Sequence, residues 1–447
     1  MSRIPWLISR RKLIFNCFAE IFLIYFLNKF ILYKYLVFTS NIDIFTLSFL
    51  PFWLVFSYII GRYSYQELVS ESNNFIIFLK LFISSIFTIL ISIFFVFSIS
   101  YNINLNNYNH FDKAILSYSI FSSFVINFLE FPLVYRLIKI SNKKENWIFV
   151  GSKELFLLII DELKFSRKKI KLEYKHLNFD FSNFSLENFK GIFFDNLEDI
   201  NLENLLLFQK SGIKFMNVEK WSQNYLQRLP LDLLNEEYLV KEKFKIYKKS
   251  LQLRIKRIGD LILSILLIIF TSPLILISGI LIYLEDGGDV FYKQERVGIN
   301  QELFTIYKLR TMNSNAEDGT AKWASINDKR VTKIGNFLRK SRLDELPQLI
   351  CVIRGEMSLI GPRPERKVFD DKLKKVIPFY NSRYFIKPGL SGWAQVNYPY
   401  GASIEDSKQK LSYDLYYLRN FSNWLDFLIF FKTIRLVFLR RGALPLK

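Results

Sequence analysis

The sequence predicts a membrane protein of three parts: an α-helical N-terminal region of four transmembrane helices, a Rossmann-like α/β middle domain, and a basic, soluble-looking C-terminal region. Two observations carry this prediction. The 447 residues are 51% hydrophobic and 17% aromatic, which excludes a disordered chain. They also include 61 Lys and Arg against 41 Asp and Glu, a net charge of +20. Such basicity indicates anionic lipid, a phosphate-bearing ligand or nucleic acid as a partner.

Four apolar runs fill residues 1–140, at 13–33, 44–60, 75–99 and 114–138. Each has roughly the 20 residues that a bilayer core requires. Basic residues precede the first run and follow the fourth, so both ends of this region are expected in the cytoplasm. Glu20, Lys80 and Glu130, inside three of these runs, should each face a neighbouring helix or lie near an interface. A homodimer formed through this region is a further hypothesis; no sequence motif argues for or against it.

The middle domain is assigned to residues 146–249. A short apolar run at 147–150 is followed by Gly151 and a helical stretch at 155–163, and further strands are expected at 191–194 and 213–218. Strand, glycine and helix in this order are typical of a Rossmann-like unit. Ser152, Lys153 and Glu154 follow Gly151, so the glycine-rich dinucleotide fingerprint is missing. We therefore predict a structural or regulatory module in preference to a nucleotide-binding one.

A long uncharged run at 261–284 opens the C-terminal region. Hydropathy alone favours a fifth membrane span there. Ser272-Pro273 lies in its middle, and a proline deletes a backbone hydrogen bond and bends a helix. A bent helix can enter and leave the bilayer by one face, so the residues alone leave both topologies open. Residues 421–441 alternate apolar and basic side chains, which predicts an interfacial amphipathic helix.

Asp344 and Glu345 are adjacent carboxylates among the cations of Arg339 and Arg342. Such a pair can coordinate a hard divalent ion and leave one oxygen to attack phosphorus. Alternatively, Ser341 and Asp344 form a capping pair at a helix start. Spacing alone does not separate the two interpretations. With two histidines and two distant cysteines, a zinc site, a Ser-His-Asp triad and a disulfide framework are excluded.

Further binding candidates flank this pair. Pro362 and Pro364 fix the backbone around Arg363, so this guanidinium loses little entropy on binding phosphate or a planar base. Two basic segments, at 294–298 and at 307–312, could reach a diphosphate, and the second contains Arg310. Gln395 lies in a glycine-punctuated loop at 387–396. Each of these patterns also occurs as an ordinary loop or solvated strand.

Together, the segments at 256–260, 272–273, 294–298, 308–312, 343–348, 361–364, 388–396 and 413–417 resemble the bacterial sugar transferase family. These are monotopic phosphoglycosyl transferases, which load a sugar phosphate onto a polyprenyl phosphate carrier. The resemblance runs from about residue 256 to residue 441. The four preceding spans and the middle domain look like those of the long-form members, so a looser likeness covers the whole chain.

The resemblance implies the chemistry. Asp344 matches the family's nucleophile, which attacks the phosphate next to the sugar of a UDP-sugar, expels UMP and forms a phosphosugar aspartate that undecaprenyl phosphate resolves. Glu345 matches the partner carboxylate, and both would hold Mg²⁺. Arg310 and Arg339 become candidates for the diphosphate. The match at Pro362, Arg363 and Pro364 implies a contact to uridine, and Gln395 is a further substrate-binding candidate.

The resemblance also implies a topology. Residues 250–447 would form a mainly α (α+β) monotopic catalytic domain, with a re-entrant helix-break-helix at 261–284 bent at Ser272 and Pro273. The protein would then be a multi-pass protein of the bacterial inner membrane that touches membrane lipid, with its catalytic domain on the cytoplasmic face. Its expected role is the initiating step of exopolysaccharide or related lipid-linked glycan synthesis.

One departure concerns the residues after the Gly-Trp-Ala-Gln motif, where many family members carry an Arg and this chain has Pro399 nearby. The identity of the sugar is therefore open. The alternative function is a non-catalytic membrane scaffold or regulator of a polysaccharide assembly machine, which has no need of Asp344, Glu345 or Arg363. Nucleic-acid binding is disfavoured, because the cations cluster beside membrane segments and not along a soluble recognition helix.

Overall fold

A computed structural model describes residues 17–26, 42–60, 74–102, 121, 124–128, 132, 145–164, 170–182, 184–196, 200–234, 251–313, 328, 330–398, 401 and 403–438. The chain divides into two compact units. One contains Leu7–Glu145 and Lys169–Lys171, and the other contains Met1–Trp6, Asn146–Lys168 and Leu172–Lys447. The boundary predicted near residue 249 falls inside the second unit.

The N-terminal unit contains α3 (Ile42–Ile60), α5 (Asn74–Asn102) and a shorter apolar helix, Cys17–Phe26. α3 and α5 coincide with the second and third apolar runs, whereas the first and fourth runs are described only in part. Glu20 is 4% exposed and accepts a hydrogen bond from the Trp53 indole of α3 over 3.2 Å. The prediction that Glu20 faces a neighbouring helix is confirmed, and the number of four spans stays a prediction.

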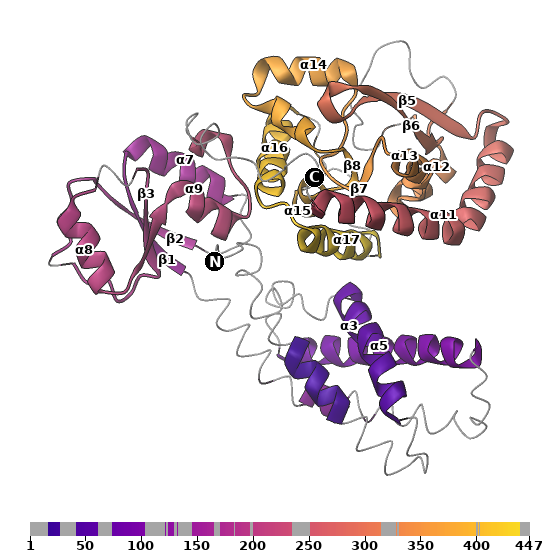
Figure 1. Ribbon diagram of the computed structural model, residues 1–447, viewed down its shortest axis with the longest axis horizontal. Coiled ribbons are helices and arrows are strands. Elements are labelled where there is room, and N and C mark those ends of the chain that lie inside the picture. Colours follow the sequence, from indigo (N-terminus) through magenta and orange to yellow (C-terminus); the bar gives the residue numbers. More distant parts are fainter. Residues whose placement is uncertain are drawn as a thin grey trace. The chain divides into compact units, whose positions relative to one another are not determined.

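The middle of the chain forms a four-stranded sheet in the order β2-β1-β3-β4, flanked by short helices (Figure 1). β1 pairs with β3 and β3 with β4 in parallel, and all four residues of β3 are buried. The strands expected at 147–150, 191–194 and 213–218 and the helix at 155–163 are present. The elements are β1 (Glu145–Val150), α7 (Lys153–Lys164), β2 (Ile170–Lys175), β3 (Gly191–Phe194), α8 (Leu202–Lys210), β4 (Lys214–Asn217), α9 (Val218–Trp221), η2 (Ser222–Leu226) and η3 (Leu231–Leu233).

Aromatic side chains surround Gly151, at the turn from β1 into α7. A Cβ there would lie 2.6 Å from the Phe149 ring, which stacks on Phe156 with 6.1 Å between centroids. The Tyr174 hydroxyl donates to the Gly151 carbonyl over 3.2 Å. In a dinucleotide-binding unit the backbone approaches a pyrophosphate at this turn. Here the turn is instead contacted by the Phe149 ring and the Tyr174 hydroxyl, and the role of the module stays a prediction.

α11 (Leu251–Asp286) is the one helix of the described residues that is long and apolar enough to cross a membrane, and 17% of its most apolar window is buried. Figure 1 shows it changing direction part-way along its length. Pro273 lies inside it and cannot donate to the Ile269 carbonyl four residues earlier. The Ser272 hydroxyl donates to that carbonyl instead, over 2.9 Å. Ser-Pro thus bends the helix while keeping the freed carbonyl paired.

Both ends of α11 are fastened to the same folded region. Near its start, Lys256 donates to the Ile360 carbonyl over 2.9 Å and pairs with Asp426 over 2.7 Å. At its end, Glu285 accepts the backbone N–H of Lys333 over 3.1 Å. A straight helix of this length would carry its ends roughly 50 Å apart at 1.5 Å per residue. The bend lets both ends reach one domain.

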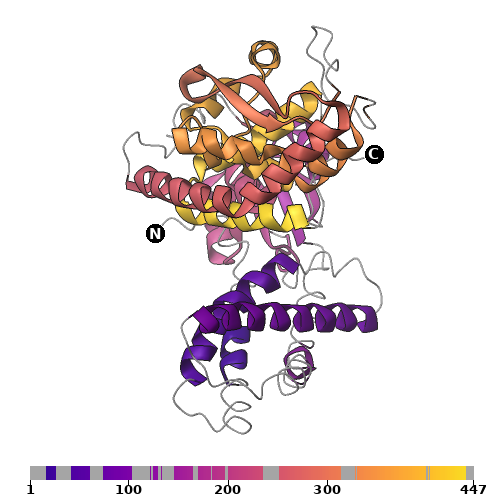
Figure 2. The same cartoon turned by 90° about the vertical axis from the view of Figure 1, so that its right-hand side faces the viewer.

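The C-terminal region is mostly helical, with an antiparallel β5–β6 hairpin and a short parallel β7–β8 pair. Figures 1 and 2 both place α17 alongside α11. The elements are β5 (Phe291–Val297), η4 (Ile299–Gln301), β6 (Leu303–Leu309), α12 (Lys333–Ser341), η5 (Leu343–Gln348), α13 (Leu349–Arg354), β7 (Ser358–Ile360), α14 (Lys367–Val376), η6 (Tyr380–Phe385), β8 (Gly389–Ser391), α15 (Trp393–Asn397), α16 (Ile404–Arg419) and α17 (Asn423–Phe438).

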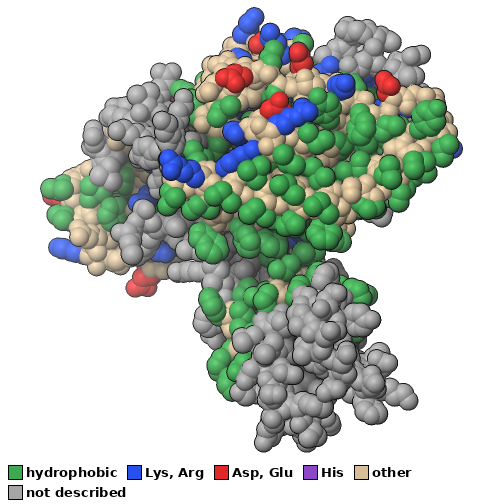
Figure 3. All heavy atoms as spheres, turned by 45° about the vertical axis from the view of Figure 1, so that its right-hand side comes forward, with side chains coloured by type: hydrophobic (Ala, Val, Ile, Leu, Met, Phe, Trp, Pro, Cys, Tyr) green, Lys and Arg blue, Asp and Glu red, His purple; other side chains and the backbone are tan. Residues whose placement is uncertain are grey.

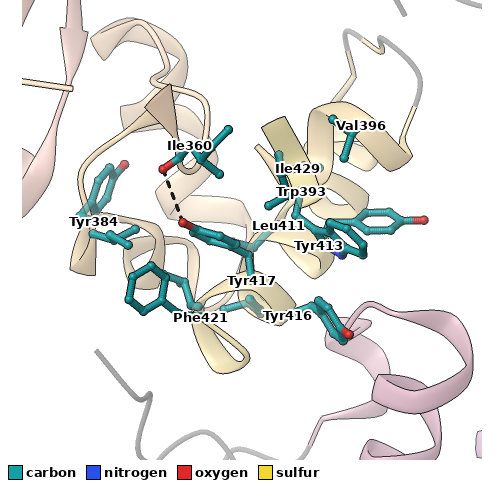
Figure 4. Packing of buried hydrophobic residues seen from close by; sticks show 14 of the residues in the cluster. Ile360, Tyr384, Trp393, Val396, Leu411, Tyr413, Tyr416, Tyr417, Phe421 and Ile429 are labelled. Carbon is teal, nitrogen blue, oxygen red and sulfur yellow. Dashed lines mark hydrogen bonds between the residues drawn. The ribbon is translucent and has the colours of Figure 1, made fainter. Parts of the chain in front are cut away.

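α16 forms the centre of this region's core, because nearly every residue of its second half is buried (Figure 4). Trp393 stacks on Tyr416 with 5.6 Å between centroids. The Tyr417 hydroxyl donates to Asp426 of α17 over 2.7 Å and lies 3.4 Å from the Ile360 carbonyl. Ser403 and Asp406 close the start of the helix with a capping box. The core therefore joins α16, α17 and the start of α11.

On the face of the C-terminal region that Figure 3 shows, hydrophobic side chains gather in a band. α17 buries Leu425 and Ile429, and it exposes Trp424 and Phe427. A helix is thus present where residues 421–441 predict one, although residues 439–441 lie outside the described part; its amphipathic, interfacial character stays a prediction. The exposed apolar residues of α11 include Ile258, Ile262, Ile265, Ile269, Phe270, Leu276, Ile277, Ile280 and Leu284.

Candidate active site

The adjacent carboxylates Asp344 and Glu345 lie in η5, directly after α12. Arg342, in the left-handed conformation at φ 60°, ends α12 and turns the chain into η5. The Ser341 hydroxyl donates back to the Phe337 carbonyl over 2.9 Å. Ser341 is thus bound within its own helix and does not form a capping pair with Asp344. Both carboxylates are buried, at 7% and 8% exposure.

Glu345 is held by three cations. Its Oε1 lies 2.6 Å from Arg363 and 3.1 Å from Lys308, and its Oε2 lies 3.1 Å from Arg342. Burial alone would raise the pKa of Glu345. The charges of Arg363, Lys308 and Arg342 outweigh burial and hold this pKa well below its usual range. Glu345 is therefore a permanently ionised group at neutral pH.

Asp344 has the opposite environment. Its Oδ1 is buried and has no hydrogen-bond partner among the described residues. Burial and the neighbouring charge of Glu345 raise its pKa to about 6, although Lys308, Arg342 and Arg339 act against this. A buried, unpartnered carboxylate oxygen is costly to keep and is available to a ligand.

Lys308, on β6, belongs to the basic segment at 307–312 that was expected to reach a diphosphate, and its contact with Glu345 was not predicted. The β5–β6 hairpin carries its ammonium to Glu345. Burial lowers the pKa of Lys308, and the carboxylate of Glu345 acts against this. Alternation along a strand could have suggested an inward-facing Lys, but the sequence does not show which face is buried.

Arg310 and Arg339, the two diphosphate candidates, differ in position. Arg339 donates from Nε to the Thr311 hydroxyl over 2.9 Å, and its charge acts on Asp344. Arg310 forms an ion pair with Asp286 at the end of α11. Arg339 therefore lies near enough to the carboxylate pair for its charge to act on Asp344, whereas Arg310 is paired with Asp286 at the end of α11.

The Pro362–Pro364 turn delivers Arg363 to Glu345, which joins two candidates that lie 18 residues apart in the chain. A small pocket beside the turn is lined by residues that include Gly298, Tyr384 and Pro388. Gln395, by contrast, donates within its own loop to the Leu390 carbonyl over 3.1 Å, and its Oε1 is buried without a partner among the described residues. Pro399 lies outside the described residues.

Within the described part of the chain, no group of three or more His, Cys, Asp and Glu side chains could hold a metal ion. A divalent cation at this site would depend on Asp344 Oδ1, on Glu345, and on oxygens of a ligand. The residues fit such an ion at Asp344, where an oxygen is free and an added positive charge would lower the cost of burial.

Known proteins resemble the chain most clearly over its C-terminal half. The family model described as "Bacterial sugar transferase" matches residues 251–440. A UDP-N-acetylgalactosamine-undecaprenyl-phosphate N-acetylgalactosaminephosphotransferase of Aeromonas hydrophila is 42% identical over 52% of this chain and 54% of its own. A UDP-glucose:undecaprenyl-phosphate glucose-1-phosphate transferase of Escherichia coli is 36% identical over 42% of this chain and 41% of its own.

The chain thus spans about half, or less, of the length of these two relatives. A shorter relative, the UDP-glucose:undecaprenyl-phosphate glucose-1-phosphate transferase of Caulobacter vibrioides, is matched over 68% of its length at 39% identity. The matched segment contains the bent helix, the carboxylate pair and the turn of Arg363. The chain belongs to the bacterial sugar transferase family.

Proposed function

We propose that the protein transfers a sugar 1-phosphate from a UDP-sugar to undecaprenyl phosphate. The observation that carries the proposal is the buried oxygen of Asp344, which has no partner among the described residues, beside a Glu345 neutralised by three cations. Relatives with this domain are named as transferases of sugar 1-phosphates to the same lipid. Their names differ in the sugar, so the sugar stays open.

The reaction proceeds in two displacements at one phosphorus. A carboxylate oxygen of Asp344 attacks the phosphate next to the sugar, a bond to that phosphorus forms, and the bond to the bridging oxygen breaks. UMP leaves with that oxygen. A phosphate oxygen of undecaprenyl phosphate then attacks the same phosphorus and releases the Asp344 carboxylate. The sugar keeps its bond to phosphate throughout, and no histidine is required.

The cations supply charge neutralisation, on which phosphoryl transfer mainly depends. Lys308, Arg342 and Arg363 surround Glu345, so a negatively charged diphosphate would meet a site whose carboxylate charge is already balanced. Arg339 lies on the side of Asp344 and is the stronger diphosphate candidate, whereas Arg310 would have to leave Asp286 to take part. The rigid Pro362–Pro364 turn would meet the uridine end.

Mg²⁺ is the proposed cofactor. Asp344 Oδ1 would hold it together with substrate oxygens and water, and Glu345 would contribute by releasing one of its cations. Mg²⁺ favours one or two carboxylates plus substrate phosphates as ligands. When bound, it neutralises charge on the phosphate oxygens. Turnover should therefore stop when EDTA removes divalent cations and return when Mg²⁺ is added in excess.

The membrane arrangement follows from α11. Both of its ends contact one domain, and its middle exposes apolar side chains, as does α17. We propose that α11 is re-entrant and α17 interfacial. The catalytic region would then lie on the cytoplasmic face of the bacterial inner membrane, in a protein with a multi-pass N-terminal region, and would act in the initiating step of exopolysaccharide synthesis.

The assay mixes the purified full-length protein, undecaprenyl phosphate, Mg²⁺ and a panel of UDP-sugars, and then identifies the nucleotide produced. We expect UMP and a lipid-linked sugar diphosphate. UDP in place of UMP would mean an ordinary glycosyltransferase and would contradict the proposal. Release of neither nucleotide with any sugar would favour the scaffold hypothesis. Asp344→Asn is the matched control, because it keeps the shape of the side chain.

A further inference from the structure

The backbone of the turn that presents Arg363 is held at four successive carbonyls. The Pro362 carbonyl accepts the Gly389 N–H over 2.8 Å, and the Glu365 carbonyl accepts the Val297 N–H over 3.0 Å. The two carbonyls between them accept side-chain donors. Arg383 donates to the Arg363 carbonyl over 2.7 Å, and Arg296 donates to the Pro364 carbonyl over 2.9 Å.

This arrangement answers a problem that the two prolines create. Pro362 and Pro364 have no N–H, so the turn can be bound to the surrounding fold only through its carbonyls and the remaining amides. A single guanidinium reaches an isolated carbonyl and can bind further acceptors at the same time. The two arginines therefore supply the hydrogen bonds to backbone carbonyls that a neighbouring strand supplies to an ordinary segment.

Arg383 itself is fixed from the other side. Its side chain is 9% exposed, and its Nη2 lies 3.3 Å from Asp414 of α16. Its Nη1 donates to the Tyr380 hydroxyl. Arg296, at the end of β5, also donates to Gln294 over 2.5 Å. Each arginine thus links the turn to a different element, α16 for Arg383 and β5 for Arg296.

We propose that Arg383 and Arg296 are positioning residues, which hold the Pro362–Pro364 turn so that the Arg363 guanidinium faces Glu345. The inference rests on the proposed function, because its main readout is that reaction. The basic segment at 294–298 thereby acquires a structural task, since Arg296 is directed at a backbone carbonyl and not at a diphosphate. Arg383 acts through Arg363, so its removal matters only while Arg363 is present.

A double-mutant cycle tests this. Arg363→Met should lower kcat about 100-fold, the scale of a lost charge or a misplacement of about 1 Å at a reacting centre. Arg383→Met should lower kcat about 10- to 100-fold. Arg383→Lys should recover part of this loss of kcat, because an ammonium can still donate to the Arg363 carbonyl. In the Arg363→Met background, Arg383→Met should add no more than about threefold. If the loss of kcat in the double variant equals the product of the two single losses, the proposal is overturned.

Arg257 provides a matched control, because it also donates to two backbone carbonyls, those of Val352 and Ile353, but does not touch the turn. The effect of Arg257→Met should multiply with that of Arg363→Met. If Arg383→Met does not fold, the same cycle is run with Arg296→Met, which removes the donor to the Pro364 carbonyl.

Hydrogen exchange of the full-length protein provides a second test, which does not depend on catalytic activity. Arg383→Met should speed exchange of the Gly389 and Val297 amides, which donate to the turn, relative to Arg257→Met. Unchanged exchange would contradict the proposal. If the wild-type protein releases no UMP, the proposed function fails, while this second test still decides whether the two arginines hold the turn.

Discussion

At the residue scale, two neighbouring carboxylates are driven to opposite ionisation behaviour. Glu345 binds all three nearby cations directly, whereas Asp344 keeps a buried oxygen without a partner among the described residues. Pairs whose environments push their pKa values apart are typical of catalytic sites. This contrast supports the proposed division of labour, in which Glu345 organises the cations and Asp344 is the nucleophile.

Substitution of each carboxylate should separate stability from activity. Asp344→Asn and Glu345→Gln should each lower turnover at least about 1,000-fold, by removing the nucleophile or the organiser of the cations. Asp344→Asn removes a repelled, buried charge, so its melting temperature should stay the same or rise. Glu345→Gln leaves three buried or half-buried cations without their counter-charge and should cost about 3–5 kcal/mol. Thermal melts and UMP release check both; full activity of Asp344→Asn would reject the covalent route.

The raised pKa of Asp344 predicts an acid limit on activity. The nucleophile must be ionised, so kcat/KM of the free enzyme should fall as the pH drops below about 6. Lys308 lowers this pKa, so Lys308→Met should move the limit to higher pH. A pH–rate profile from 5 to 9 measures it. If the acid-side midpoint of kcat/KM has the same pH in Lys308→Met as in the wild type, Asp344 is not the titrating group.

At the element scale, the proposed re-entrant topology depends on α11 and its Ser-Pro pair. The proline removes one helical hydrogen bond, and the Ser272 hydroxyl restores a partner for the Ile269 carbonyl. The bend therefore costs little and is locally encoded. Its consequence is not local, because the contacts of Lys256 and Glu285 at the two ends need it.

Restoring the missing N–H should straighten the helix. A single-cysteine protein with Cys17 and Cys351 changed to Ser carries Asp289→Cys as a label site. We expect labelling from the cytoplasmic side only, and Pro273→Ala should add a fraction labelled from outside. Ser272→Ala keeps the proline, so it should lower stability by about 1 kcal/mol without changing the side that reacts. Labelling of the unaltered helix only from outside would overturn the re-entrant assignment.

At the scale of the whole molecule, a buried ion pair fastens the β-sheet module to the catalytic region. Arg228, 1% exposed, pairs with Glu162 of α7 and donates to Gln409 of α16. The next residue, Leu229, donates its N–H to the Ser412 carbonyl over 2.9 Å. Trp393, of the Gly-Trp-Ala-Gln motif, donates to the Gln227 carbonyl over 2.9 Å. The Trp of that motif thus contributes a hydrogen bond to the contact between the β-sheet module and the catalytic region.

Loss of Arg228 should therefore be costly. Arg228→Met leaves Glu162 buried without its counter-charge and should destabilise the unit by about 3–5 kcal/mol. The control is Lys408→Met, which breaks the more exposed pair with Asp232 and should cost about 0.2–1 kcal/mol. Denaturant titration of both variants checks the difference. Equal effects would show that the buried pair does not hold the junction.

Much of this organisation could be predicted because it depends on local patterns. The strand at 147–150, the helix at 155–163 and the presence of a helix at the C-terminal end follow from periodicity, and the position of Glu20 follows from the cost of an unpaired charge among apolar residues. β2 and α8 were missed, although the alternation of apolar and polar residues in Ile170–Lys175 is typical of a half-buried strand. Asp344, Glu345 and Arg363 were found by motif, whereas Lys308 needed the packing of the hairpin.

The sequence by itself determined the apolar runs, the bend at Ser-Pro and the family, because each rests on residue type and order within a short stretch. Only the tertiary structure decided that Glu345, and not Asp344, binds the cations. It also decided that Arg310 is engaged by Asp286 and that Arg296 and Arg383 hold a backbone turn. The reason is physical: a cation's partner depends on distance and burial, and both arise when segments remote in sequence pack together.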